Sequence, residues 1–179
     1  MSRIRRLMAS GLTASLLAVA SGLALAAPSH AAVADMACEG QTTTNYSPGL
    51  TNTAQGVTIS GTINFYACLS TSHPLLTKGK LSGGSGGPVT VSCAILEEKT
   101  SGTSTIVWAN SSTTTFSYTT DVNVDESGLG AVTLSGKVTS GLFAGDNIVI
   151  AATYDSVQGT CASTGGITSR SGPTTLAIT

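Results

Sequence analysis

The sequence has few of the side chains on which enzyme active sites depend. Among its 179 residues there are two His, and Asp, Glu, Lys and Arg together make up 9%. His73 is the one histidine beyond residue 31, no Gly-x-Ser-x-Gly stretch precedes a helical pattern, and no Cys-x-x-Cys pair is present. A Ser–His–Asp hydrolase, a zinc site and a thioredoxin-type redox centre each lack a required group. We therefore predict that the protein is not an enzyme and holds no metal or cofactor.

A basic run is also missing outside the N-terminus. Arg3, Arg5 and Arg6 precede an apolar stretch over 11–27, and the small residues of "APSHAAVADMA" follow it. This is the pattern of a secretory signal peptide, which we assign to 1–31, and the stretch is short for a bilayer span of about 20 residues. The mature chain keeps five basic and all nine acidic residues, a net charge of −4. We predict a secreted, extracellular protein that binds neither nucleic acid nor, after cleavage, a membrane.

The cysteines all lie in the mature part of the chain. An even number of cysteines in an exported chain predicts two disulfides, for which three pairings are possible. Cys93 has the inward parity of a predicted strand, and Cys161 is the only cysteine late enough to come from the opposite half of the fold. We therefore favour Cys38–Cys68 and Cys93–Cys161.

Alternation of apolar and polar residues dominates the mature chain, and helical periodicity is absent. The pattern predicts about seven short strands. They are Val57–Phe65, Val89–Ile95, Ile106–Trp108, Phe116–Val124, Val132–Val138, Ile148–Tyr154 and Leu176–Ile178. We predict an all-β, antiparallel, immunoglobulin-like β-sandwich, and a transthyretin-like or jelly-roll topology shares the same pattern.

The remaining segments define the predicted domain organisation. Residues 32–55 are polar and are predicted to be an N-terminal arm, and 56–179 to be the sandwich domain. Long loops are expected over 70–88 and 161–173. Trp108, the single tryptophan, is expected to pack against the inter-sheet disulfide.

Two short motifs have both a functional and a structural interpretation. In "DVNVDESG" Asp121, Asn123 and Asp125 have the spacing of calcium ligands, but the sixth position is Glu126 rather than glycine, which favours a strand that runs into an acidic turn. The stretch "SGLFAGD" predicts a structural corner. Its residues are Gly141, Phe143, which closes the core, Gly145, with a positive φ, and Asp146, which accepts backbone hydrogen bonds.

Several stretches resemble a group of small secreted actinomycete proteins, most of unassigned function. They are "CEGQTTTNYSPGLTNT", "SGKVTSGLFAGDNIV" and the terminal "GPTTLAIT", whereas "WANSS" departs from the Trp-Asn/Asp-Gly of many members. The chain is similar in particular to the adaptor subunit of streptomycete umbrella toxin particles. That resemblance implies partners, a trypsin-like lectin subunit and a repeat-containing toxin, and an arm that inserts into one of them. The arm residues expected to bind are Asn45, Tyr46, Ser47, Pro48, Gly49 and Leu50.

The predicted function is therefore that of a non-catalytic protein-binding module, an adaptor or structural subunit of an extracellular assembly such as a toxin particle. The alternative is a secreted protease inhibitor that presents a disulfide-supported loop, 70–88 or 161–173. Lys78 or Arg170 is then the residue that enters a trypsin-like specificity pocket.

Overall fold

The computed structural model describes residues 34–95, 100–124 and 127–179. The predicted signal peptide over 1–31 lies outside these residues, as do Asp125 and Glu126 of the calcium-like motif. The described residues are strands and connections with no α-helix, and every strand pairing is antiparallel, so the predicted all-β antiparallel class is confirmed. None of the described segments is a helix long and apolar enough to span a membrane.

The strands are longer than the sequence pattern predicts, and they are rich in Thr, Val and Ile, which suit a pleated, half-buried surface. They are β1 (Met36–Leu50), β2 (Gln55–Ser70), β3 (Gly79–Val91), β4 (Ser101–Trp108), β5 (Thr113–Val124), β6 (Gly130–Gly141), β7 (Asn147–Tyr154), β8 (Ser156–Gln158) and β9 (Ile167–Ile178). A single 3-10 turn, Cys93–Ile95, follows β3. Burial alternates residue by residue along most of them, which identifies one inward and one outward face.

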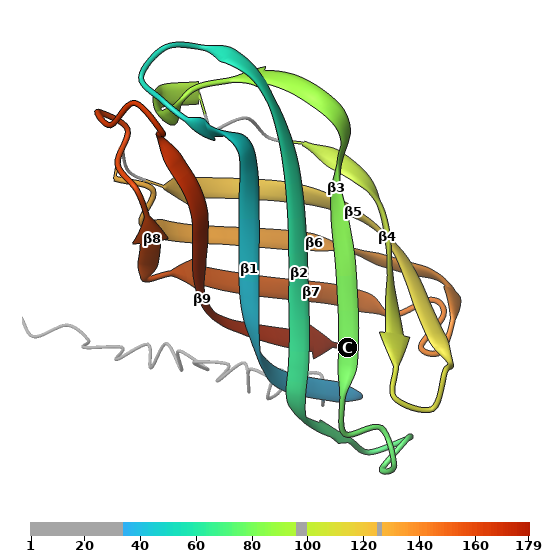
Figure 1. Ribbon diagram of the computed structural model, residues 1–179. Helices are drawn as coiled ribbons and strands as arrows, with labels where there is room; N and C mark the ends of the chain where they lie inside the picture. Colours follow the sequence, from blue (N-terminus) through green and yellow to red (C-terminus); the bar gives the residue numbers. More distant parts are fainter. Residues whose placement is uncertain (1–33, 96–99, 125–126) are drawn as a thin grey trace, which may run out of the picture. The chain divides into compact units, whose positions relative to one another are not determined.

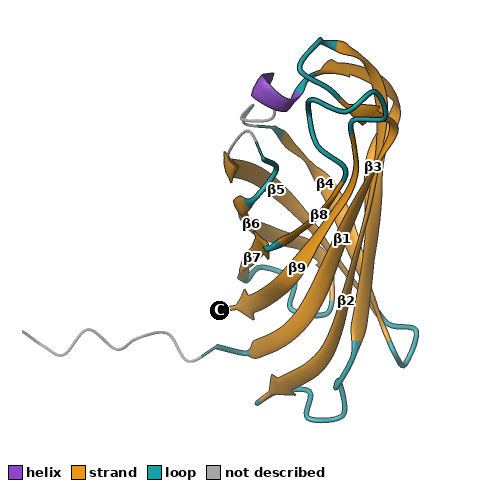
Figure 2. Cartoon of the chain, turned by 60° about the vertical axis from the view of Figure 1, so that its left-hand side comes forward, coloured by secondary structure: helices purple, strands orange, loops and turns teal. Residues whose placement is uncertain are grey.

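The sheet closes on itself, which differs from the predicted sandwich. Each strand from β1 to β6 pairs with the one that follows it. β9 pairs with β7 and β8, and it also pairs with β1 from Met36–Ile178 to Asn45–Ser169. Eight strands thus form a barrel, with β8 as a short addition at its margin. Figures 1 and 2 show β1, β2 and β3 on one side and β5, β6 and β7 on the other, crossing at a steep angle. Alternation looks the same in a sandwich and a barrel, so only the long-range β1–β9 ladder separates the two.

The predicted N-terminal arm is also corrected by the structure. Residues 36–50 of the expected 32–55 arm form β1, which pairs with β2 on one edge and β9 on the other. Its inward positions include Thr42 and Thr44, both buried, so the alternation of this strand is hidden from a search for apolar residues. Two ladders of backbone hydrogen bonds hold the segment in place despite its polar sequence.

The two predicted long loops are shorter than expected. β3 begins at Gly79, within the expected 70–88 loop, and pairs with β2 through its glycine-rich part. β9 begins at Ile167, within the expected 161–173 loop. In both cases neighbouring strands supply the hydrogen-bond partners, and this overrides the low strand propensity of Gly and Ser.

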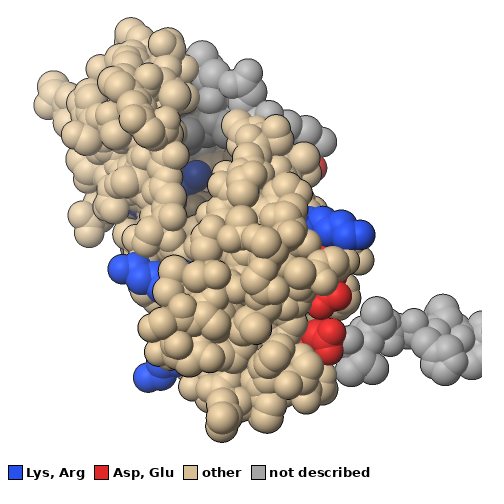
Figure 3. Space-filling model, turned by 90° about the vertical axis from the view of Figure 1, so that its right-hand side faces the viewer, with Lys and Arg blue, Asp and Glu red and all other residues tan. Residues whose placement is uncertain are grey.

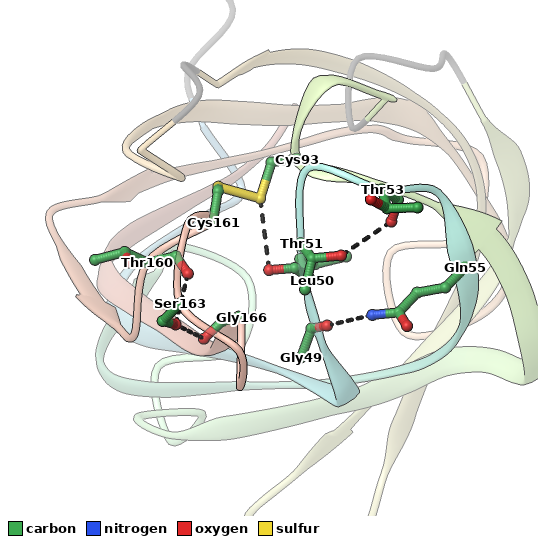
Figure 4. The surroundings of a disulfide bond; sticks show 10 residues. All are labelled: Gly49, Leu50, Thr51, Thr53, Gln55, Cys93, Thr160, Cys161, Ser163 and Gly166. Carbon is green, nitrogen blue, oxygen red and sulfur yellow. Dashed lines mark hydrogen bonds between the residues drawn. A yellow bond between two sulfur atoms is a disulfide. The ribbon is translucent and has the colours of Figure 1, made fainter.

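Both predicted disulfides are present. Cys38–Cys68 joins directly opposite positions of β1 and β2. Cys93–Cys161 joins the 3-10 turn after β3 to the segment between β8 and β9, so Cys93 does not lie on a strand as predicted. Figure 4 shows this bond beside the Leu50 carbonyl, whose oxygen lies 3.6 Å from the Cys93 sulfur. A disulfide sulfur carries no hydrogen, so we describe this approach as a packing contact.

The largest core cluster fills one part of the barrel. Trp108 donates a hydrogen bond from Nε1 to Thr114 Oγ1 at 2.8 Å, and its ring meets Phe143 edge to face at 6.3 Å between centroids. Phe65 and Phe116 are fully buried in the same cluster. The Cys93–Cys161 bond belongs to a second, smaller cluster with Leu50 and Ile167. Trp108 therefore does not pack against that disulfide, contrary to the prediction.

Candidate functional site

The interior of the barrel is hollow along one row of cross-strand neighbours. Arg170 of β9 lies opposite Thr44 of β1, Thr44 lies opposite Gly61 of β2, and Gly61 lies opposite Gly83 of β3. Glycine in a strand interior leaves no side chain to fill the space in front of it. A Cβ added at Gly83 would meet no atom within 4 Å. A Cβ added at Gly61 would be in ordinary van der Waals contact with two oxygen atoms, the nearer of them at 3.7 Å. This row therefore leaves interior space in front of a long basic side chain.

The space is a cavity of about 300 Å³, and all eight barrel strands contribute to its wall. Its apolar wall is formed by Ile59, Ile63, Leu81, Val122, Val132 and Leu134. Its polar groups are hydroxyls, such as those of Thr42 and Ser104, and the guanidinium of Arg170. The volume lies at the lower limit of ligand pockets, which range from about 300 to 1,000 Å³. An eight-stranded barrel is of a size either to be filled by side chains or to hold one small molecule.

Arg170 is the one buried cation among the described residues, with 7% of its surface exposed. Its guanidinium carbon lies 4.0 Å from the centroid of the Tyr154 ring and 5.7 Å from that of Tyr46. Cation–π contacts of this kind hold the group in place but do not use its N–H donors. Within the described part of the chain, Nε and Nη1 of Arg170 are buried without a hydrogen-bond partner.

Tyr46 provides a second unpaired polar group at the same place. Its side chain is 4% exposed, and its hydroxyl is buried with no hydrogen-bond partner in the described residues. Burial raises the pKa of Tyr46, the charge of Arg170 opposes this rise in part, and Tyr154 adds to it. The hydroxyl of Tyr154, in contrast, is 2.9 Å from Thr44 Oγ1 and makes a hydrogen bond. Tyr46 therefore stays protonated at neutral pH and has a hydroxyl available.

The charge of this site is uncompensated. The described residues that line the cavity include no Asp and no Glu, and no ion pair involving Arg170 occurs among the described residues. Buried charges in proteins are normally paired, because removing an ion from water is costly. Arg170 thus differs from an ordinary structural arginine in that its charge and two of its nitrogens have no counterpart among the described residues.

The cavity opens between β3 and β4. These strands pair only where Gly79–Leu81 meets residues 106–108. Gly83 and Gly84 of β3 and Ser104 of β4 are among the residues that line the cavity. Figure 3, which views this face, shows a hollow between two lobes with a basic side chain recessed inside it. The described residues therefore leave the site open to solvent on this face.

Comparisons with known proteins do not identify a relative. No family model, no curated protein and no solved structure matches this chain. The function must therefore be argued from the cavity and its side chains.

The predicted partner-binding residues do not form one surface. Asn45, Ser47 and Pro48 are exposed on the outer face of β1. Tyr46, Gly49 and Leu50 are buried, and Tyr46 lines the cavity. Because side chains alternate along a strand, a run of six consecutive residues in β1 divides between the exterior and the interior.

The predicted corner residues form the turn between β6 and β7. Gly141 and Gly145 have φ values of +85° and +100°, and Phe143 has a φ of +63°. The Phe143 ring is buried and meets His73 edge to face at 5.0 Å between centroids. Asp146 donates its backbone N–H to the Phe143 carbonyl at 3.1 Å, and its own carbonyl accepts from Val138 N at 2.9 Å. The turn is thus held by backbone hydrogen bonds, and no side-chain bond of Asp146 is found among the described residues.

The residues predicted for an inhibitor loop are separated by the structure. Arg170 is buried within β9, so it cannot enter a protease specificity pocket, and this part of the prediction is wrong. Lys78 is exposed immediately before β3. The part of the chain that is described holds no group of three or more His, Cys, Asp or Glu residues able to bind a metal ion.

Sequence reasoning missed the cavity, although one signal was present. In the predicted strand over 57–65, every inward position carries an apolar side chain except the one occupied by Gly61. A glycine at an inward position marks either a bulge or a place where a ligand or backbone approaches closely. Gly83 and Arg170, which lie in the same cross-strand row as Gly61, follow it by 22 and 109 positions in the sequence. No local pattern connects them, so only the strand register shows that they share one interior.

Proposed function

We propose that this chain is an exported binding protein that holds a small ligand inside its barrel and carries out no chemistry of its own. The observation that supports this most directly is the buried guanidinium of Arg170, whose Nε and Nη1 have no partner among the described residues and which borders a cavity of about 300 Å³. An unpaired buried polar group costs about 1–3 kcal/mol, so its retention is reasonable where a ligand satisfies it.

The composition of the cavity wall supports binding rather than catalysis. The lining residues provide hydroxyls, phenols and one guanidinium, whereas general acid–base and nucleophilic catalysis mostly rely on His, Asp, Glu, Lys or Cys. Export is supported by the predicted signal peptide over 1–31 and by the two disulfides, which are consistent with an oxidising environment.

The proposal is tested by thermal unfolding of the mature protein with a panel of neutral, cationic and anionic small molecules. A ligand that binds only the folded state raises the melting temperature in a saturable way. Gly61→Leu fills the cavity from within the wall, where an added Cβ meets no atom closer than 3.7 Å. Gly56→Leu, on the exposed part of the same strand, is the matched control. We expect stabilisation in wild type and Gly56→Leu and none in Gly61→Leu; a panel without effect on wild type contradicts the proposal.

The adaptor role remains a second candidate, favoured by a groove on the outer surface. This groove of about 740 Å³ crosses β2, β3 and β4. It exposes 54% of Tyr66 and 49% of Val107, and Lys78 and Lys80 border it. Exposed apolar side chains with a polar border are typical of protein-binding surfaces. In this role the barrel surface, rather than an inserted arm, would contact the partner.

The adaptor role is tested by native mass measurement of tagged protein isolated from culture supernatant. Wild type is expected in a complex, and Tyr66→Ser is expected to be released from it. Val149→Ser, which changes an exposed side chain on β7, should leave the complex intact. Wild-type protein that is monomeric throughout would contradict this role without affecting the cavity proposal.

A further inference from the structure

We infer that the cavity selects a small organic acid, whose carboxylate binds Arg170 and whose apolar body lies against the interior wall. This inference rests on the proposed function and specifies its ligand. Three properties of the described residues support it: the sign of the buried charge, the arrangement of the unpaired donors, and the polarity of the remaining wall.

The sign of the buried charge favours an anion. The side chain of Arg170 is a guanidinium cation, and no acidic residue is found among the described residues that line the cavity. A neutral ligand would leave this charge uncompensated in a site of low dielectric constant, whereas a cationic ligand would be repelled. An anion supplies the missing counter-charge and therefore binds with the largest electrostatic gain.

The unpaired donors favour a carboxylate. The Tyr154 ring lies over the guanidinium at 4.0 Å, which restricts its orientation and leaves the in-plane N–H groups of Nε and Nη1 without partners among the described residues. A guanidinium has two planar forks that each match the two oxygens of a carboxylate, Nε with Nη2 and Nη1 with Nη2, so each fork contains one of the unpaired nitrogens. The unpaired hydroxyl of Tyr46, whose ring centroid is 5.7 Å from the guanidinium carbon, is a further donor nearby.

The rest of the wall favours an acid with one charge and an apolar body. The side chains of Ile59, Leu81 and Val132 line the cavity, and Arg170 is the only cation among the described residues of its wall. A phosphate or sulfate dianion would need further cationic donors and would gain nothing from these side chains. A short aliphatic or aromatic monocarboxylate matches both parts of the wall, and the opening beside Gly83 is the way in.

The inference is tested by calorimetric titration of the mature protein, first refolded from denaturant to remove any bound molecule. The probes are hexanoate and phenylacetate, each compared with its own amide, together with inorganic phosphate and sulfate. We expect each acid to bind at least tenfold more tightly than its amide, and neither inorganic anion to compete. Amides that bind as tightly as the acids would overturn the charge selection while leaving the proposed function intact.

Variants of the donors assign the selection to named groups. Arg170→Gln should weaken binding of the acids at least tenfold and leave the weaker binding of the amides unchanged. Arg170→Lys keeps the charge but loses the fork, so its affinity for the acids should lie between those of wild type and Arg170→Gln. Tyr46→Phe should weaken binding of the acids a few-fold. An Arg170→Gln protein that is folded by circular dichroism and still binds the acids at full strength would overturn the inference, as would phosphate binding more tightly than the acids.

If Arg170→Gln does not fold, Gly83→Leu provides an independent test. An added Cβ at Gly83 meets no atom within 4 Å, so we expect the leucine to be accommodated and to take up part of the space beside β3. Gly87→Leu on the same strand is equally unobstructed and does not line the cavity. Association of hexanoate should slow at least tenfold in Gly83→Leu and stay unchanged in Gly87→Leu; equal rates in both would overturn the proposed position of the ligand. If no acid or amide binds wild type, the inference is overturned, whereas the proposed function fails only if the whole panel of neutral, cationic and anionic molecules has no effect.

Discussion

Two parts of the same barrel interior are built in opposite ways. In one, bulky side chains such as Trp108, Phe65 and Phe116 are almost completely buried against one another. In the other, the row that runs from Arg170 through Thr44 to Gly61 leaves a cavity of about 300 Å³. The strands β1, β2 and β9 pass through both parts. Whether the barrel interior is filled therefore depends on the size of the inward side chains along each strand, and not on the backbone of the barrel.

This contrast shows how stability and binding are divided along each strand. A packed interior stabilises the fold in proportion to the apolar area it buries. The hollow part gives up that contribution and retains unpaired polar groups in its place. Ligand sites are commonly less stable than the scaffold that carries them. The predictions that follow test this division, beginning with the largest expected effect.

Removal of the central ring of the packed part should have the largest effect. Trp108→Ala leaves a cavity and removes the hydrogen bond to Thr114, and we expect a loss of about 5 kcal/mol of unfolding free energy. Chemical denaturation followed by circular dichroism measures this loss. Val107→Ala, at the exposed neighbouring position, should change stability by less than about 0.5 kcal/mol. Similar values for the two variants would show that this part is not tightly packed.

Removal of the disulfide beside the second cluster should have the next largest effect. Cys93 and Cys161 are 68 positions apart, and replacing both with Ser should cost about 4 kcal/mol through the added entropy of the unfolded chain. The matched pair, Cys38 and Cys68, is 30 positions apart and should cost about 0.7 kcal/mol less. Denaturant titration of both double variants provides the measurement. A much smaller loss for the longer loop would mean that the unfolded chain is already constrained there.

Replacement of the buried cation should move stability in the opposite direction. Arg170→Met removes donors that have no partner in the described residues and fills the same volume with apolar atoms, although it also loses the contact with Tyr154. We expect the ligand-free protein to gain about 1 kcal/mol. The same substitution at Lys137, which is exposed on β6, serves as the control. A loss of several kcal/mol in Arg170→Met would identify Arg170 as a structural residue.

The last prediction concerns Tyr46, whose effect on stability is absent at neutral pH and develops only at high pH. Burial raises the pKa of Tyr46 in the folded state, so above the ordinary value of about 10 the unfolded state loses a proton that the folded state keeps. The unfolded state then binds fewer protons, and stability falls as pH rises, by at most about 1.4 kcal/mol per pH unit. Melting temperatures of wild type and Tyr46→Phe should diverge above about pH 10. Parallel curves would show that the Tyr46 ring is accessible to water.

The elements that could be predicted are those with a local signal. Alternation at Val57–Phe65 and Ile148–Tyr154 identifies strands that the structure contains, because each residue's face depends only on its own position. β1 was missed because Thr42 and Thr44 occupy its inward positions, and a threonine on an inward face looks like a polar loop residue. The opening residues of β3 were missed because glycine has a low strand propensity, which pairing with β2 overrides.

The sequence by itself determined the all-β class, the alternation that separates inside from outside, and cysteines whose spacing favoured the observed pairs. These properties depend on residue type and on positions close together in the chain. Closure of the barrel and the meeting of Arg170, Tyr46 and Gly61 were decided only by the tertiary structure. Arg170 follows Gly61 by 109 positions, and the β1–β9 ladder that brings β9 next to β1 joins the first and last strands of the described residues. Such contacts depend on strand register over long loops, for which no short stretch of sequence carries a signal.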